Sequence, residues 1–378
     1  MSVSQGGKIM PKRVGFLCEK VLTEANCIEA VKIGTKNLKH THKIRRIREN
    51  ADDVGRKILQ TLENGWVPDE PRERVINEGS AMKTRHLRIP STRDHLIHTA
   101  IMLPLIPLIE KRLDFYCAGS VPGRGQKRIH HCIKGWMGRK NPPKYAGETD
   151  VRHAYETTTK ETVMRSLRRI VKDKRYLMWM EQILDQMGGS LAIGFTPSHW
   201  LFNLVMADVD RAVRAKGKGV LYCRFMDNIW IADGRKRRLH RAMRLIDEEC
   251  GKLGLSLNRS TQVFPTRKRA IQALSYRYFH GHILLKKATM VRITKGIKRA
   301  GNNTNAHHCR AAMSLIGITR HCNSYNYRKN YVYGVVSIKR MKGVISIADK
   351  KRNLRGAAKQ GDRSKDSQNC TGAGQLSA

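Results

Sequence analysis

The stretch LYCRFMDNIWIADG, residues 221–234, consists of two apolar runs that meet at Met226, Asp227 and Asn228. Two such runs on either side of turn-forming residues are typical of a β-hairpin. Asp and Asn are common in turns because their side chains bond nearby backbone groups. The stretch alone therefore predicts an ordinary turn, and residues elsewhere in the chain must decide whether Asp227 has a chemical role.

The charge of the chain points to a polyanionic partner. Its 378 residues include 73 Lys+Arg against 31 Asp+Glu, a formal net charge of +42. Basic residues run through nearly the whole length, which favours a long nucleic-acid groove over a small patch. An anionic membrane is the rival partner, but it usually requires a bulky amphipathic helix or a lipid signal, and we find neither in the sequence.

We expect a cytoplasmic protein. The start, MSVSQGGKIM, lacks the apolar core of a signal peptide, and no run approaches the ~20 apolar residues of a spanning helix. The nine cysteines include no CxxC pair. Such cysteines fit reduced thiols better than a disulfide framework.

The predicted secondary structure changes several times along the chain. Residues 1–75 are predicted to be a basic, polar helical lead, and the next region mixes short strands and helices. A basic amphipathic helix is predicted to end near Met187, and Thr196 and Pro197 are predicted to cap and begin the next helix. A strand pair is predicted to turn at 280–281, and the segment after it is predicted to be mainly helical. The Gly/Ser/Lys/Gln-rich tail at 354–378 is predicted to be disordered.

Asp150 gives the hairpin a possible partner. It follows a predicted strand about 75 residues before Asp227, and Tyr155 comes five positions later. Carboxylates on a strand and on a hairpin can converge to hold two Mg²⁺ ions for nucleotidyl transfer. Between them lies IGFTPSHWLFN (193–203), a predicted loop and helix that can pack beneath a nucleotide through Gly194, Ser198 and Asn203.

An ordered set of motifs resembles the palm of reverse transcriptases. These motifs are DVRHAY (150–155), IGFTPSHWLFN, RFMDN (224–228), LGLSLN (253–258) and ALSYRY (273–278). Upstream, KTRHLRIPSTRDHLIHTAI (83–101) and SVPGRGQKRIHHCI (120–133) resemble the fingers motifs of bacterial members. Each motif alone is weakly specific, but the ordered set runs from about residue 10 to 353.

Within that family the sequence is most similar to reverse transcriptases of diversity-generating retroelements. Those enzymes carry IGxxxSQ, and this chain has Ile193, Gly194 and Ser198, with His199 in place of the glutamine. HCNSYNYRKNYV (321–332) and VISIADKKRN (344–353) resemble their thumb. The resemblance implies an α+β right-hand polymerase. Its parts would be the helical lead (1–75), fingers (76–148), a palm with an antiparallel sheet (149–290) and a helical thumb (291–353).

The resemblance also implies a metal site. Asp150 would be the first ligand, aided by the carbonyl of Val151, and Asp227 the second. Asn228 stands where the family has a second Asp. A neutral amide oxygen binds Mg²⁺ more weakly than a carboxylate does. The resemblance therefore implies a two-Mg²⁺ enzyme that is slow, with a possible preference for Mn²⁺.

The implied nucleotide site draws on both groups of motifs. Tyr155 would be a steric gate that excludes a 2′-hydroxyl, so the product would be DNA; the alternative is a core aromatic. The fingers would supply cations that bind the template and the triphosphate; the alternative is that these cations form a solvated basic face. The loop and helix at 193–203 would lie beneath the nucleotide. These residues are Arg85, Arg88, Arg124, Lys127, Gly194, Ser198, His199 and Asn203.

Two further departures from the family pattern concern Val121 and LNRST (257–261). Val121 stands where relatives have a basic residue, which leaves Arg124 to hold the triphosphate. LNRST lacks the usual lysine, so the proton donor to pyrophosphate is unassigned. These departures also suit a degenerate polymerase that acts only as an RNA-binding protein.

The implied activity is RNA-templated DNA synthesis from dNTPs, error-prone at template adenines. The partners would be a structured template RNA, the cDNA or primer, and a small basic accessory protein, in a bacterial or phage-encoded system. A retron, phage-defence or group II intron reverse transcriptase is the alternative within the family.

Other candidate sites are weaker. The clusters HHC (130–132 and 307–309) and HC (321–322) match no zinc-finger spacing, and structural or RNA-facing roles are expected for them. Asp208 and Asp210 are expected to form ion pairs with Arg211 and Arg214 rather than to bind metal.

Overall fold

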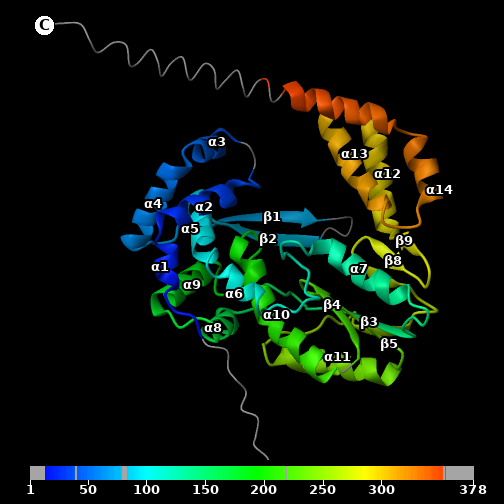
Figure 1. The fold of residues 1–378 in the computed structure, drawn as a ribbon, viewed down its shortest axis with the longest axis horizontal. Helices are drawn as coiled ribbons and strands as arrows, with labels where there is room; N and C mark the ends of the chain where they lie inside the picture. The colour runs from blue at the N-terminus through cyan, green and yellow to red at the C-terminus, as the bar shows by residue number, and fades with distance from the viewer. Residues whose placement is uncertain (1–12, 39–40, 79–82, 218, 352–353, 355–378) are drawn as a thin grey trace, which may run out of the picture. The chain divides into compact units, whose positions relative to one another are not determined.

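The computed structural model describes residues 13–38, 41–78, 83–217, 219–351 and 354. The chain divides into two compact units, residues 1–268 and 269–378, which we describe separately (Figure 1). The division does not test the predicted limits of lead, fingers, palm and thumb. The predicted disordered tail lies outside the described residues except for residue 354.

The first unit opens with helices, as predicted, but they end at Glu63, and a strand begins at Arg72, inside the range 1–75 predicted to be helical. The helices are α1 (Leu17–Val21), α2 (Glu24–Thr35), α3 (His42–Glu49) and α4 (Ala51–Glu63). Gly55 lets α4 approach α2 closely, since a Cβ there would lie 2.9 Å from the backbone nitrogen of Ile28. The buried faces of these helices join the core of the unit through residues such as Leu17, Val31 and Leu62.

A two-stranded antiparallel ribbon follows the lead, formed by β1 (Arg72–Glu78) and β2 (Lys83–Ile89). After it come α5 (Thr92–Met102), α6 (Ile106–Glu110) and α7 (Gly125–Met137). The N-terminus of α5 is capped by Ser91, whose hydroxyl accepts a hydrogen bond from the Asp94 amide at 3.1 Å.

The first unit also contains an antiparallel sheet of four strands. Its order is β4-β5-β3-β6, with β3 (Tyr145–Asp150), β4 (Leu221–Phe225), β5 (Asn228–Asp233) and β6 (Gln262–Pro265). Helix α11 (Lys236–Gly251) packs on this sheet, and Gly147 allows the contact because a Cβ there would lie 2.9 Å from the Met243 methyl. The predicted hairpin at 221–234 is confirmed, with Met226 and Asp227 as its loop.

Two helix predictions are corrected. The single helix expected before Met187 is two helices, α8 (Lys160–Arg168) and α9 (Lys174–Gln186). Asp173 separates them because its carboxylate caps α9 and also accepts hydrogen bonds from the Leu17 and Cys18 amides, each at 3.0 Å. The N-cap of α10 (Thr196–Lys216) is Phe195 rather than Thr196.

The second unit contains an antiparallel sheet of order β7-β8-β9 and several helices. The strands are β7 (Ile271–Ala273), β8 (Tyr276–Tyr278) and β9 (Ile283–Leu285), so the predicted turn at 280–281 is confirmed and a third strand is added. The helices are α12 (Lys287–Asn302), α13 (Ala306–Thr319), α14 (Tyr325–Arg328), the π-helical turn η1 (Lys329–Tyr333) and residues 338–351.

The mixed helical and antiparallel architecture confirms the α+β class. Among the described residues, no helix combines the length and the apolar character that crossing a membrane requires.

Candidate functional site

The hairpin loop that carries Asp227 has an unusual backbone. Phe225 pairs with Asn228, which leaves only Met226 and Asp227 to reverse the chain. Met226 has φ 56°, a left-handed conformation that costs a residue with a side chain about 1 kcal/mol or more. Gly119 allows the loop its position, because a Cβ there would lie 2.4 Å from the Met226 nitrogen. Such strain is common at functional sites.

The sheet register brings Asp150 beside Asp227. Asp150 is the last residue of β3 and pairs with Asn228 on β5. The amide of Val151 donates to the carbonyl of Asp227 at 3.2 Å. Both carboxylates line a cavity of about 510 Å³. The other lining residues are Thr84, Arg85, Val151, Arg152, His153, Ala154, Tyr155, Glu156, Ile193, Phe202, Met226, Asn228 and Asn258.

Two polar side chains that the sequence did not reveal hold the Asp150 carboxylate. Asn258 Nδ2 donates to one carboxylate oxygen at 3.1 Å, and Ser260 Oγ donates to the other at 3.3 Å. The segment reaches Asp150 because Leu257 pairs antiparallel with Val151. Only this pairing, about 100 residues apart in sequence, identifies Asn258 and Ser260 as part of the site.

Asn228 is exposed and turned toward the neighbouring carboxylate. Its Nδ2 donates to Asp227 Oδ1 at 2.9 Å. Within the described residues no group of three or more His, Cys, Asp or Glu side chains is arranged to hold a metal ion. The donor set is therefore two carboxylates with neutral oxygen donors nearby. That set fits Mg²⁺, which commonly binds through one or two carboxylates with waters and substrate phosphates completing its shell.

Tyr155 lies in the same cavity, half-buried against the side chain of Phe202 at a ring distance of 5.7 Å. Burial, with a further contribution from the Asp227 charge, raises the pKa of Tyr155 to about 12. The phenol is therefore neutral at physiological pH. It presents an aromatic ring and a hydroxyl next to the two carboxylates, not a third negative charge.

The four predicted nucleotide-binding cations separate into two groups. Arg85 lines the cavity from β2, whereas Arg88 lies outside it. The Nε of Arg88 is 3.3 Å from a carboxylate oxygen of Glu73 across the ribbon. Arg124 Nη1 donates to the carbonyls of Asp114 and Cys117, at 2.6 and 2.9 Å.

The remaining fingers residues of the implied site also lie outside the cavity lining. Lys127 is exposed on α7, and Val121 is buried in the core. The structure therefore brings only Arg85 of the four predicted cations to the carboxylates. Contacts of the other three with a bound nucleic acid stay predictions.

The loop and helix at 193–203 form one wall of the cavity, through Ile193 and Phe202. Gly194 has φ 115°, and a Cβ there would lie 2.3 Å from the Arg88 carbonyl oxygen, so a larger residue would clash with β2. Ser198 is buried, and its hydroxyl donates to the Ala192 carbonyl at 2.7 Å. Burial lowers the pKa of His199 to about 4, so it is neutral at physiological pH, and it does not line the cavity. Asn203 is fully buried and donates to the Gly119 carbonyl at 2.8 Å.

A buried ion pair beneath the hairpin fixes the loop. Arg224 and Asp210 have no exposed side-chain surface, and the guanidinium donates to both carboxylate oxygens at 2.7 Å. Arg224 Nη1 also donates to the Met226 carbonyl at 2.8 Å and to Asn203 Oδ1 at 3.0 Å. Tyr222 donates its hydroxyl to the same Asp210 carboxylate. The pair therefore ties α10 to the loop that carries Asp227.

The expected pairing of the helix α10 aspartates is correct for one residue and wrong for the other. Asp208 pairs with Arg211 at 3.3 Å and with Arg169, as a surface carboxylate would. Asp210 faces inward to Arg224, and Arg214 instead lies 3.5 Å from Asp114. An arginine inside the apolar strand 221–225 was the signal, because a buried guanidinium requires a buried partner.

No family model matches the chain, and no curated protein matches it. Among solved structures, the chain is similar to telomerase from Candida albicans in complex with a TWJ fragment of telomeric RNA, with 9% identity and a TM-score of 0.47. The match covers 73% of this chain and 56% of that one, so the chain spans just over half the length of that telomerase chain. A likeness at this level carries no assignment of function.

Proposed function

We propose that the chain is an RNA-directed DNA polymerase with a right-hand fold, in which the cavity at Asp150 and Asp227 is the nucleotidyl-transfer site. One observation carries the proposal. The two carboxylates are on neighbouring antiparallel strands, at one end of the sheet, in a cavity that also contains Tyr155 and Arg85. This is the arrangement that the motif order implies for a reverse transcriptase. The charge of +42 supplies the attraction for RNA.

Part of the cavity lining would hold the metal ions. Asp150 and Asp227, with the Val151 carbonyl, would hold two Mg²⁺ ions, and Mn²⁺ would suit the site as well. When bound, the ions would activate the 3′-hydroxyl of the primer and neutralise charge on the departing pyrophosphate. Asn258 and Ser260 orient the Asp150 carboxylate by hydrogen bonds to its two oxygens.

The remaining cavity residues would select and bind the nucleotide. Tyr155 would lie under the deoxyribose and exclude a 2′-hydroxyl. Arg85 would contact the triphosphate, since a guanidinium matches phosphate oxygens in geometry and charge. Asn228 adds no negative charge to the site, which predicts a slow enzyme.

The finer proposal is error-prone cDNA synthesis in a diversity-generating retroelement. It is supported by the IGxxxSH sequence at 193–199 and by the sequence segments 321–332 and 344–353, which resemble the thumb of those enzymes. It entails a template RNA and a small basic accessory protein. A template repeat and a variable repeat in the flanking DNA, differing at adenines, would support it. Their absence would favour a retron, phage-defence or group II intron type.

The experiment is primer extension with dNTPs on an RNA template, in Mg²⁺ and in Mn²⁺. The full chain should incorporate dNTPs only with a divalent metal, and Asp150→Ala or Asp227→Ala should abolish incorporation. Asn228→Asp should increase the rate in Mg²⁺ more than in Mn²⁺. An unchanged rate in both metals would refute the role given to Asn228.

A second candidate is a degenerate polymerase that only binds RNA. Asn228 and the buried Val121 favour it, because each stands where the family has a charged residue. Intact RNA binding, with no metal-dependent incorporation by the wild-type chain, would establish this candidate and refute the enzyme.

A further inference from the structure

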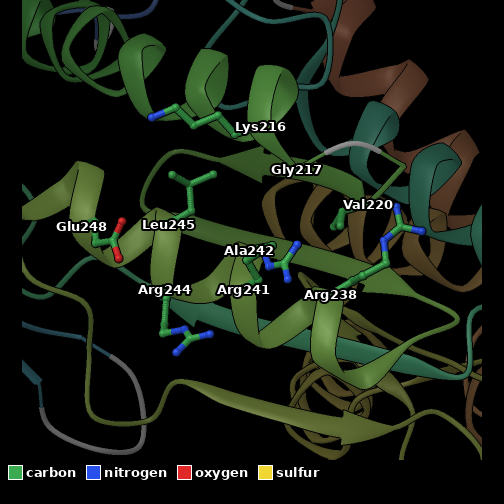
Figure 2. Close-up of a pocket in the computed structure, with 9 residues that line it drawn as sticks. All are labelled: Lys216, Gly217, Val220, Arg238, Arg241, Ala242, Arg244, Leu245 and Glu248. Atoms are coloured by element: carbon green, nitrogen blue, oxygen red, sulfur yellow. The ribbon is translucent and has the colours of Figure 1, made fainter.

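A second cavity, of about 470 Å³, lies between the C-terminal end of α10 and α11 (Figure 2). Val220, one of its lining residues, comes just before β4, whereas Asp227 follows the other end of that strand. At ~3.3 Å per residue, the strand separates them by about 20 Å. The cavity is therefore distinct from the one that holds the carboxylates. Its lining is Lys216, Gly217, Val220, Arg238, Arg241, Ala242, Arg244, Leu245 and Glu248.

The cationic side chains around this cavity differ in how they are neutralised. Lys216 lies 3.6 Å from Glu249, and Arg238 lies 3.4 Å from Asp233. Arg241 and Arg244 are exposed, and within the described part of the chain neither side chain has a hydrogen bond or an ion pair. The cavity therefore has two guanidinium groups that form no ion pair within the described residues, and Glu248 is the acidic residue of its lining.

These two arginines belong to a longer basic stripe on α11, formed by Arg237, Arg241 and Arg244. Their spacing of four and three residues places them on one face of the helix, and all three are exposed. Like charges at this spacing repel one another, and Arg237, in the first turn of α11, also opposes the macrodipole. The first turn contains no acidic residue to offset them. An anion bound along the stripe would relieve this repulsion.

We propose that the basic stripe and its cavity bind the phosphodiester backbone of RNA, at a site separate from the polymerisation cavity. That the polyanion is RNA rests on the function proposed above. The stripe covers about 10 Å at 1.5 Å per residue. That length is enough to contact consecutive phosphates of one RNA strand.

The rest of the lining indicates how the RNA would be read. Val220, Ala242 and Leu245 are aliphatic and offer no side-chain donor or acceptor for a base edge, and Glu248 is the acceptor side chain among the lining residues. Contacts to phosphate and sugar position a nucleic acid without reading its sequence. The stripe would therefore hold the template RNA outside the active site, whatever its sequence, while the carboxylates act on the primer end.

The test removes the two unpaired charges with Arg241→Gln/Arg244→Gln. The matched control is Lys32→Gln/Lys57→Gln, which removes two exposed charges from α2 and α4. Arg241→Lys/Arg244→Lys keeps the charge, and circular dichroism compares the folding of all variants. Fluorescence anisotropy measures binding to a long structured RNA at several salt concentrations, and primer extension uses a short primer–template duplex.

The proposal predicts that the glutamine variant binds the long RNA at least about tenfold more weakly than the control does. The slope of log Kd against log salt should fall by about 1.5 to 2, the lysine variant should recover most of the binding, and extension of the short duplex should be unchanged. Binding no weaker than that of the control would overturn the proposal. Loss of short-duplex extension without weaker binding of the long RNA would also overturn it. If no variant extends a primer, the polymerase proposal fails, but the binding comparison still decides this one.

Discussion

Removing the buried Asp210 carboxylate tests how the hairpin is held. Asp210→Asn would leave the Arg224 guanidinium charged, fully buried and without its counter-charge. Breaking a buried pair in this way costs about 3–5 kcal/mol. The matched control is Asp208→Asn, two residues earlier on α10. Asp208 is 26% exposed and pairs with surface arginines, so its loss should cost under about 1 kcal/mol.

The assay is urea unfolding followed by tryptophan fluorescence. All five tryptophans are in the first unit, so the signal reports on the unit that contains the pair. A further variant, Asp210→Leu/Arg224→Met, should lose much less stability than Asp210→Asn because no unpaired charge remains. Equal losses for Asp210→Asn and Asp208→Asn would refute the reasoning. Incorporation of dNTPs should also fall in Asp210→Asn, because Arg224 holds the Met226 carbonyl beside Asp227.

Three further predictions concern other parts of the first unit. Gly194→Ala should lower the free energy of unfolding by about 1–3 kcal/mol, since φ is 115° and the new Cβ meets the backbone of β2. In the same urea assay, the control Gly135→Ala in α7 should raise the free energy of unfolding by about 0.5–1 kcal/mol, because its Cβ meets nothing within 4 Å. Tyr155→Ala should reduce the preference for dNTPs over rNTPs at least about tenfold in primer extension, and Tyr155→Phe should keep it; equal selectivity in the two variants would contradict a steric gate. Burial lowers the pKa of His98 to about 3, so the unfolded chain binds a proton at His98 below pH 6.5 and the folded chain does not. The contribution of His98 to stability is therefore complete above pH 6.5 and decreases as the pH falls toward 3, by up to about 1.4 kcal/mol per pH unit. The urea midpoint of His98→Phe should decline less between pH 7 and 5 than that of the wild type.

The sequence predicted the features that depend on local pattern. Two apolar runs on either side of Met226 and Asp227 identified the hairpin. The motif order suggested that Asp150 and Asp227 converge, and the antiparallel register of β3 and β5 has them side by side.

What the sequence missed depends on contacts between distant segments. Asn258 reaches Asp150 only through the pairing of Leu257 with Val151. The break between α8 and α9 depends on Asp173 binding the amides of α1. In neither case does a local pattern identify the partner, because the hydrogen bond joins residues about 100 or more positions apart.

The central claim is that Asp150 and Asp227 together carry out metal-dependent nucleotidyl transfer on an RNA template. Its most direct test is the single-turnover rate of dNTP incorporation for the wild type, Asp150→Asn and Asp227→Asn, with RNA affinity measured on the same samples. We predict Mg²⁺- or Mn²⁺-dependent incorporation by the wild type, a loss of at least about 10³-fold in each variant, and unchanged RNA affinity. Incorporation by either variant at the wild-type rate would contradict the claim.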